Sequence, residues 1–447
     1  MINMKKQLKI FLALILFQYS FAQEKLDNYI KNGLENSEII KQQNIKLNHS
    51  LYALKEAKSL FLPNVAFNST YTIADGGRTI DFPIGDLLNP VYSSLNQLTN
   101  SNNFPQLQNQ SILLNPNNFL DTKIHTTLPI INAESIYNKR IKQQQYDLQK
   151  IEIDIYKREL VKEIKLAYFN YLKANEVISI LENALKLVQE NQRINNSLFK
   201  NDKINRTSVV RSDNEVTKIN VQLETAKLTK ANAQNYFNFI LNNALDSKIE
   251  IDDYKQIPNF DTQITIDNRE ELNKLNCAKD INNNVIKLSN AFQIPKLNGF
   301  LDLGTQAFDF EFNNKSRYYF AGLSLEWSLF SGNKNKYKVK QAELESKIIA
   351  SQISNVEQQL KLQLQIAQNK FQTAINQYNS SQSQVETSQK YYSDIFKLYK
   401  EGQALFIELL DAQNQLITAQ IQANISLYET WIANAEIERA NASFNLK

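Results

Sequence analysis

Two acidic residues, Glu408 and Asp411, follow a lone glycine in the stretch LYKEGQALFIELLDAQNQL. The glycine, Gly402, interrupts a pattern that is helical on both of its sides. A spacing of three residues places both carboxylates on one face of the helix that follows. Such a pair concentrates negative charge on that face, although the usual place for it is a solvated helix surface.

A comparable turn occurs about two hundred residues earlier, in LFKNDKINRTSVVRSDNEV. It has the same Leu-aromatic-Lys opening, and a polar turn, Lys200–Asn205, stands in place of the glycine turn. Ser208 and Arg211 occupy the positions that correspond to the two acids. The chain therefore makes this turn twice but carries the acid pair on one copy only, which predicts unequal roles for the two turns.

Residue types that support catalysis are otherwise scarce. The two histidines, His49 and His125, stand in unrelated contexts without an HExxH motif, and we expect His125 on the polar face of a strand. The single cysteine, Cys277, rules out an intramolecular disulfide and is best explained as a small buried residue. No GxxxxGK[ST] motif or strand-bound GxGxxG motif occurs. These observations predict a protein that is not an enzyme and that uses no cofactor or metal.

Composition and charge argue against a nucleic-acid partner. The 447 residues include 50 basic and 46 acidic side chains, so the chain is close to neutral. Beyond the N-terminal segment, no cluster of Lys and Arg with interleaved aromatic residues occurs. The chain is also too long for one compact core.

The first 22 residues are typical of a secretory signal peptide. Lysines within Lys5–Lys9 precede the apolar run Ile10–Phe17, and small residues precede a cleavage site after Ala22. The alternative, a membrane anchor, requires an apolar run of about 20 residues, and this run is much shorter. We therefore expect export and removal of residues 1–22.

Two kinds of periodicity alternate along the remaining chain. Heptad-like spacing of Leu, Ile and Ala predicts long coiled-coil helices over residues 24–60, 133–200, 205–245, 269–293, 333–400 and 404–445. A period of two predicts four strands, Asn64–Ile73, Leu120–Ile130, Leu297–Phe310 and Tyr319–Leu329. The segment Asp75–Phe119 is rich in Pro, Asn and Gln, and we expect a long loop there.

The order helix, strand, loop, strand, long helix, turn, long helix occurs twice. The strand entry FLPNVAF also matches QIPKLNGF in the second half. This predicts an internal duplication, with a first repeat over 23–245, a linker over 246–268 and a second repeat over 269–447. Open strand edges cannot face lipid, so we expect these strands to close a barrel with copies from other chains.

Together these features resemble the TolC-like outer-membrane efflux and secretion channel family over essentially the whole mature chain. The resemblance rests on the duplication, on LP before the first strand, on LFSGNKNKYKVKQAE after the last strand, and on LYKEGQALFIELLDAQNQL. It implies an α+β membrane protein that forms a homotrimer in the outer membrane of a Gram-negative bacterium. Each chain would give four strands to a twelve-stranded transmembrane β-barrel, and its long coiled-coil helices would form a periplasmic α-barrel.

The resemblance also implies roles for individual residues. Glu408 and Asp411 correspond to acidic rings at the periplasmic gate, and Tyr399 corresponds to a residue that helps close the aperture. Ala404 stands where well-known members have a gate-linking arginine, and Arg206 or Arg211 could replace that arginine. Adaptor docking is expected at the two turns, through Gly402, Asp202 and Lys203. Contact with lipid is expected for Tyr71, Tyr319 and Trp327.

We therefore expect a passive, gated conduit that exports small molecules or proteins within a tripartite efflux pump or a type I secretion system. Its partners would be a periplasmic adaptor (membrane fusion) protein, an inner-membrane RND, MFS or ABC transporter, and outer-membrane lipid. The alternative is a secreted coiled-coil structural or adhesion protein without a pore. Strands placed at equivalent points in both halves favour the channel.

Overall fold

The computed structural model describes residues 24–259, 265–267 and 269–446. The expected signal peptide, residues 1–22, lies outside the described residues, as does part of the expected linker, residues 260–264 and 268.

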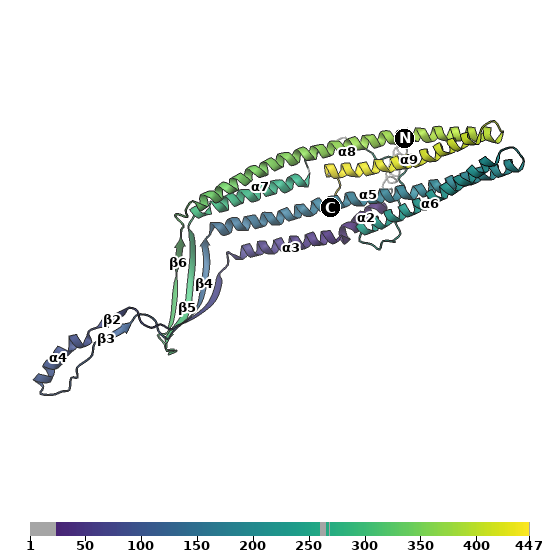
Figure 1. Ribbon diagram of the computed structural model, residues 1–447. Coiled ribbons are helices and arrows are strands. Elements are labelled where there is room, and N and C mark those ends of the chain that lie inside the picture. Colours follow the sequence, from purple (N-terminus) through teal and green to yellow (C-terminus); the bar gives the residue numbers. More distant parts are fainter. Residues whose placement is uncertain (1–23, 260–264, 268, 447) are drawn as a thin grey trace, which may run out of the picture. The chain divides into compact units, whose positions relative to one another are not determined.

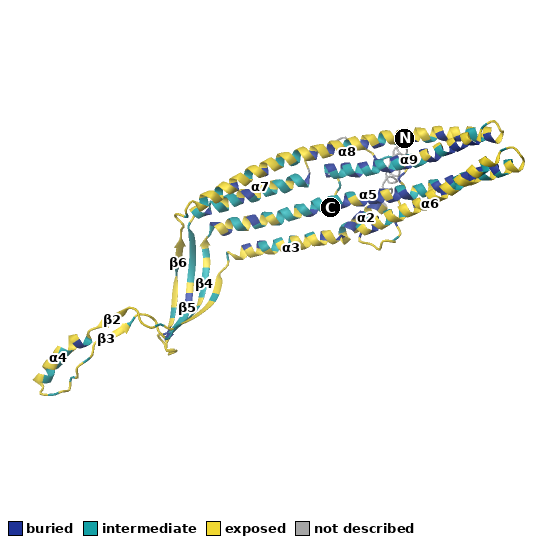
Figure 2. Ribbon diagram, viewed as in Figure 1, coloured by how far each residue is buried: buried dark blue, intermediate teal, exposed yellow. Residues whose placement is uncertain are grey.

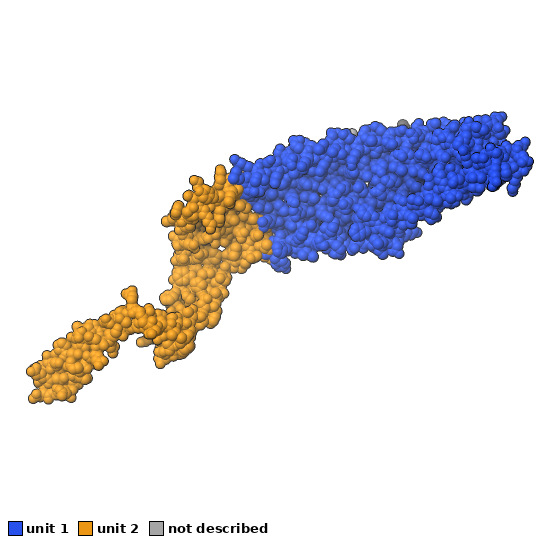
Figure 3. All heavy atoms as spheres, in the orientation of Figure 1, with its two compact units in different colours: residues 1–52, 143–283, 344–447 blue, residues 53–142, 284–343 orange. Residues whose placement is uncertain are grey.

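The chain divides into two compact units, and each unit draws on both halves of the sequence (Figure 3). The first, which we call the helical unit, consists of residues 1–52, 143–283 and 344–447. The second, which we call the strand unit, consists of residues 53–142 and 284–343.

Within the described residues, seven α-helices belong to the helical unit or lead into it (Figure 1). They are α2 (Glu24–Asn36), α3 (Glu38–Ser59), α5 (Ala133–Lys200), α6 (Arg206–Ile240), α7 (Glu270–Ser289), α8 (Lys334–Lys400) and α9 (Phe406–Asn441). Helices α5 and α8 have 68 and 67 residues, so each would extend about 100 Å at ~1.5 Å per residue. Within the described ranges, no helix combines the length and the apolar character needed to cross a membrane.

Helices α5 and α6 form one hairpin, and α8 and α9 form another (Figure 1). Buried residues run along facing sides of these helices (Figure 2). The largest core cluster lies where α2, α5, α6 and α9 meet, and it includes the fully buried Tyr168 and Phe237. The segment that follows α6 adds Tyr254 to this cluster. The chain therefore packs against the core before residue 260, where the described range ends.

One expected helix, 24–60, is interrupted at Ser37. The Ser37 hydroxyl accepts a hydrogen bond from the backbone N–H of Ile40 at 3.3 Å, which is the position of a helix N-cap. The chain therefore ends α2 and begins α3 at this serine.

The strand unit contains an antiparallel sheet with the order β1-β4-β5-β6. Its strands are β1 (Asn64–Thr72), β4 (Phe119–Ile131), β5 (Lys296–Phe308) and β6 (Arg317–Glu326). These match the four predicted strands, except that β5 and β6 end early. Asp309 and Phe310 have φ values of +50° and +59°, which turn the chain out of the extended conformation after Phe308. Trp327 and Leu329 lie beyond the end of β6.

The strand register gives the sheet two different faces. Tyr71 lies opposite Leu120, and further along β4 Ile124 lies opposite Leu303, which in turn pairs with Tyr319. Residues paired across an antiparallel sheet share a face, so the apolar positions of all four strands gather on one side. The other side carries polar residues of β4 and β5, including His125 opposite Asp302.

The expected loop Asp75–Phe119 is a folded extension between β1 and β4. It contains β2 (Thr79–Phe82), α4 (Ile84–Leu98) and β3 (Gln110–Leu113), and β2 pairs with β3. Figure 2 shows that most of this extension is exposed. The expected long loop therefore contains secondary structure of its own, because asparagine side chains hold α4 to the returning chain.

Candidate functional site

Gly402 ends α8 and makes the turn into α9. It has a φ of +76°, and the backbone N–H of Gln403 reaches back to the carbonyl of Leu398 at 2.8 Å. This is the hydrogen bond of a helix C-terminus closed by a left-handed residue, a conformation that glycine adopts without steric cost. The glycine is therefore explained by the turn itself, whatever docks there.

The α5–α6 turn has the same backbone hydrogen bond with a different residue at its centre. Asp202 takes the left-handed conformation, with a φ of +54°, and the N–H of Lys203 bonds the carbonyl of Leu198 at 2.9 Å. Asp202 and Lys203 are exposed at this turn. The two turns thus have matching backbones and different side chains.

Glu408 is exposed, but its carboxylate is occupied. One oxygen accepts a hydrogen bond from the backbone N–H of Leu405 at 2.7 Å and so caps the start of α9. At the start of α6 the side chain of Asn205 performs the capping, by accepting the N–H of Ser208 at 3.2 Å. The difference between Ser208 and Glu408 is therefore partly a difference in how each helix begins.

Asp411 lies one turn further into α9 and is also exposed. Its carboxylate accepts a hydrogen bond from the side chain of Gln415 at 2.8 Å, a contact within the same helix. Neither acid has an ion pair with a residue of the described chain. Of the two, Asp411 is the carboxylate that holds no part of the backbone in place.

Tyr399 is buried rather than open to a channel, with 4% of its surface exposed. Its hydroxyl donates a hydrogen bond to the side-chain oxygen of Asn195 on α5. Burial raises the pKa of Tyr399 to about 12, so the hydroxyl remains a neutral donor at physiological pH. The predicted gate residue therefore joins one hairpin to the other.

A second amide contact lies close to this one in the sequence. The side-chain N–H of Asn191 donates to the side-chain oxygen of Gln413 on α9 at 2.7 Å. Asn191 Oδ1 and Gln413 Nε2 are buried, and neither has a hydrogen-bond partner among the described residues. We call Asn191, Asn195, Tyr399 and Gln413 the amide cluster.

Three members of the amide cluster, Asn191, Asn195 and Gln413, were not predicted from the sequence. Asn191 and Asn195 are four residues apart and so share one face of α5. Gln413 directly follows Ala412, a position in the apolar seam of α9. The sequence signal that could have identified these residues is the presence of polar side chains on the packing face of a coiled coil.

The arginines suggested as replacements for a gate-linking residue do not fill that role within one chain. Arg206 and Arg211 are both exposed, and the described residues offer neither of them an ion pair. Ala404 is half-buried beside the apolar residues of the tips. Any link between these arginines and the acids would have to involve another chain.

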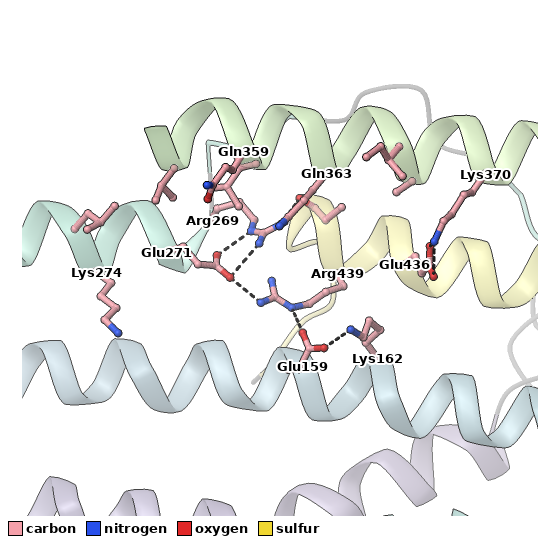
Figure 4. Close-up of a pocket in the computed structure, with 16 residues that line it drawn as sticks. Glu159, Lys162, Arg269, Glu271, Lys274, Gln359, Gln363, Lys370, Glu436 and Arg439 are labelled. Carbon is pink, nitrogen blue, oxygen red and sulfur yellow. Dashed lines mark hydrogen bonds and ion pairs between the residues drawn. The ribbon is translucent and has the colours of Figure 1, made fainter. Parts of the chain in front are cut away.

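A charged cluster joins three helices elsewhere in the helical unit (Figure 4). Arg439 of α9 donates to Glu271 of α7 at 2.7 Å and to Glu159 of α5 at 3.0 Å. Arg269, which is almost fully buried, donates to Glu271 at 2.8 and 3.0 Å and to the carbonyl of Ala440 at 2.8 Å. We call Glu159, Arg269, Glu271 and Arg439 the charged cluster.

In the charged cluster, ion pairing changes the pKa of Glu271 more than burial does. Burial alone would raise the pKa of Glu271, but the hydrogen bonds and charges of Arg269 and Arg439 lower this pKa to about 2. Residues of the cluster line an open cavity of about 710 Å³ together with residues of α8 (Figure 4). Nowhere in the described chain do three or more carboxylate, imidazole or thiol groups converge to hold a metal ion.

The strand unit holds the residues expected to face lipid. Tyr71, Tyr319 and Trp327 are all exposed, and the register places Tyr71 and Tyr319 on the same apolar face. The opposite face carries an ion pair between Lys123 and Asp302 at 3.0 Å, and His125 also contacts Asp302. The expectation that His125 lies on a polar strand face is confirmed.

Three comparisons with known proteins bear on this arrangement. A family model described as "Outer membrane efflux protein" matches residues 262–442. A search of curated proteins gives no match.

Several solved structures resemble the chain over nearly its whole length. VceC, an outer membrane protein of Vibrio cholerae, has a TM-score of 0.75 at 12% identity, with 94% of this chain and 97% of that chain covered. The CmeC outer membrane channel of Campylobacter jejuni has a TM-score of 0.73 at 15% identity, with 93% and 85% covered. The open state of the MtrE outer membrane channel of Neisseria gonorrhoeae has a TM-score of 0.74 at 15% identity, with 93% and 88% covered.

At such low identity these likenesses establish the fold, and the match to the family model covers residues 262–442. The predicted resemblance to TolC-like channels is confirmed. Residues 262–442 match the family model of outer membrane efflux proteins, and the chain has the fold of outer-membrane channels such as VceC, CmeC and MtrE.

Proposed function

We propose that this protein is the outer-membrane channel of a tripartite efflux pump or a type I secretion system. The observation that carries the proposal is the sheet β1-β4-β5-β6, which has one apolar face, one polar face and two open edges. Open edges in a bilayer cost several kcal/mol for each unsatisfied backbone group, on the order of a lost hydrogen bond in hydrocarbon.

Closure with other copies removes this cost. If β1 of one chain pairs with β6 of the next, three chains form a closed barrel of twelve strands, with the apolar face toward lipid and the polar face toward water. Tyr71 and Tyr319 would then contact lipid or its interface, and Lys123 and His125 would line the lumen.

The long hairpins α5–α6 and α8–α9 would extend into the periplasm and form the α-barrel. Their turns, with Asp202, Lys203 and Gly402, would meet a periplasmic adaptor protein. An RND, MFS or ABC transporter of the inner membrane would select the cargo and supply the energy. The channel itself would remain a passive conduit.

We place the periplasmic gate at the ends of the two hairpins. In each chain the amide cluster holds the hairpins together through Tyr399–Asn195 and Asn191–Gln413. Three copies of Asp411, and of Glu408 beside it, would surround the opening with negative charge and favour cations. Opening would require separation of the hairpins at the amide cluster.

Two measurements test the channel. Protein extracted from outer membranes should be an elongated trimer, and after reconstitution into planar bilayers it should conduct ions with a preference for cations. A soluble monomer without conductance would instead support a secreted coiled-coil structural or adhesion protein.

A further inference from the structure

The extension between β1 and β4 holds its helix in a fixed orientation. The side chain of Asn89 accepts the backbone N–H of Leu107 at 2.7 Å and donates to the carbonyl of the same residue at 2.9 Å. Asn96 makes the same pair of bonds with Phe104, at 3.0 and 2.7 Å. Both asparagines use their full amide to clamp the returning chain to α4.

The distance between the two asparagines along α4 matches the distance between Phe104 and Leu107 along the returning chain. Seven residues of helix rise about 10.5 Å, and three residues of extended chain cover about 10 Å. At the start of α4, a Cβ on Gly85 would lie 2.4 Å from the carbonyl oxygen of Leu107, so only glycine permits this close approach. The side of α4 that faces away from the returning chain is therefore defined.

That outer side is apolar and exposed. Leu87, Val91 and Leu98 form a stripe along α4 and are 69%, 51% and 83% exposed. The helix contains one charged residue, Asp86. An exposed apolar stripe on a helix is typical of an interaction surface.

The ribbon β2–β3 that leads to and from α4 has the same property. Ile80 pairs with Ile112, and Phe82 lies two residues from Ile80 on the same face. All three side chains are exposed. A ribbon of two strands is at best marginally stable on its own in water, so this face also needs a partner.

We propose that the extensions of three copies of this chain pack against one another through the Leu87–Val91–Leu98 stripe and form a cap over the outer end of the conduit. The proposal rests on the trimer proposed above, because the β1–β4 connections of three chains would then lie at the same end of one barrel. Tethering makes the contact intramolecular in effect, so a small apolar surface is sufficient.

Charge favours a second copy over other occupants. Residues 75–119 contain three aspartates and one arginine and no lysine, which gives a net charge of −2 (1 − 3). A surface rich in lipid phosphates would repel such a segment. The stripe itself has no charge that would select a foreign protein, whereas identical uncharged stripes meet without repulsion.

Site-specific cross-linking tests the cap. In a Cys277→Ser background, Val91→Cys places a thiol on the stripe, and Ser93→Cys places a matched thiol about 200° around the helix. Intact cells are treated with a short bismaleimide, and the protein is analysed on denaturing gels. We expect a covalent dimer of this chain with Val91→Cys in large excess over Ser93→Cys.

The controls separate the cap from the channel. A native trimer that gives no excess of cross-linking at Val91 overturns the cap and leaves the channel intact, and so does cross-linking of Val91→Cys to a different protein. A protein that is not trimeric in either variant overturns the proposed channel itself.

A second readout does not depend on cross-linking. Val91→Asp with Leu98→Asp places charges on already exposed positions, so folding of the chain should be unaffected. In the trimer these charges would repel one another, and we expect at least a doubling of the entry of large antibiotics into cells. Unchanged entry with a normal trimer would show that the stripes do not close the outer opening.

Discussion

The helical unit is cross-connected by two polar clusters of opposite character. The charged cluster joins α5, α7 and α9 through two arginines and two glutamates. The amide cluster joins α5 to α8 and α9 through neutral side chains. Both clusters contain buried polar atoms without a hydrogen-bond partner among the described residues, Arg439 Nη1 in the charged cluster and Asn191 Oδ1 and Gln413 Nε2 in the amide cluster.

The two clusters are therefore suited to different structural roles. Separating a buried ion pair leaves an uncompensated charge and costs about 3–5 kcal/mol, whereas a neutral hydrogen bond contributes about 1 kcal/mol. The charged cluster is therefore suited to fix its three helices. The amide cluster is suited to a contact that breaks and re-forms, as a gate would require.

The largest effect should come from Arg439. Arg439→Met leaves Glu159 and Glu271 with less compensation, and we expect a loss of about 3–5 kcal/mol in the free energy of unfolding. The measurement is a denaturant titration followed by helical circular dichroism. The control is Lys370→Gln, which removes an exposed pair with Glu436 and should cost less than about 1 kcal/mol. Equal losses in the two variants would contradict the role of the charged cluster.

Acid should weaken the charged cluster specifically. The folded pKa of Glu271 is about 2, below its ordinary value of 4.5. Its contribution, about 3 kcal/mol, is therefore complete above pH 4.5 and is lost as the pH falls toward 2. Glu271→Gln should be less stable than the wild type at pH 7, and the difference should shrink as the pH approaches 2. A difference that does not change with pH would show that Glu271 is not held ionised by its arginines.

A smaller effect is expected in the amide cluster. Tyr399→Phe leaves a buried acceptor on Asn195 without its donor, which should cost about 1–3 kcal/mol. Because the lost bond joins the two hairpins, we also expect more frequent openings in single-channel recordings. Tyr391→Phe, on the exposed side of the same helix, serves as the control. If both variants open equally often, the amide cluster does not restrain the gate.

The smallest effect on stability should come from the exposed acid. Asp411→Asn should change the free energy of unfolding by less than about 0.5 kcal/mol, because its carboxylate contacts only Gln415. Its effect should appear in the current, as a reduced preference for cations. Glu408→Gln retains an oxygen that can cap α9, so it tests charge at the neighbouring position without removal of the cap. Unchanged ion selectivity in both variants would place the acids outside the pore.

The sequence predicted the long helices and the four-stranded sheet because their signals are local and repeated. A heptad pattern over 68 residues remains recognisable when one position departs from it. The same holds for an alternation of apolar and polar residues over ten residues. Gly402 was found for the same reason, since a glycine between two helical segments marks a turn.

The remaining features depend on contacts between distant residues. Asn89 and Asn96 resemble loop residues in isolation, and only their bonds to Leu107 and Phe104 hold the returning segment against α4. Tyr399 was predicted from the resemblance, but its partner Asn195 lies 204 residues away. Glu408 was predicted as a gate charge, and its hydrogen bond to Leu405 adds a capping role that the charge pattern did not indicate.

The placement of the two tryptophans has a practical consequence. Trp431 belongs to the helical unit, where its ring packs on Tyr254 and its N–H donates to the carbonyl of Gln256 at 2.9 Å. Trp327 belongs to the strand unit and is exposed. The chain has no other tryptophan. Intrinsic fluorescence therefore offers one natural optical reporter for each unit, and a Trp327→Phe variant would let the emission of Trp431 follow the helical unit alone during folding, assembly or opening.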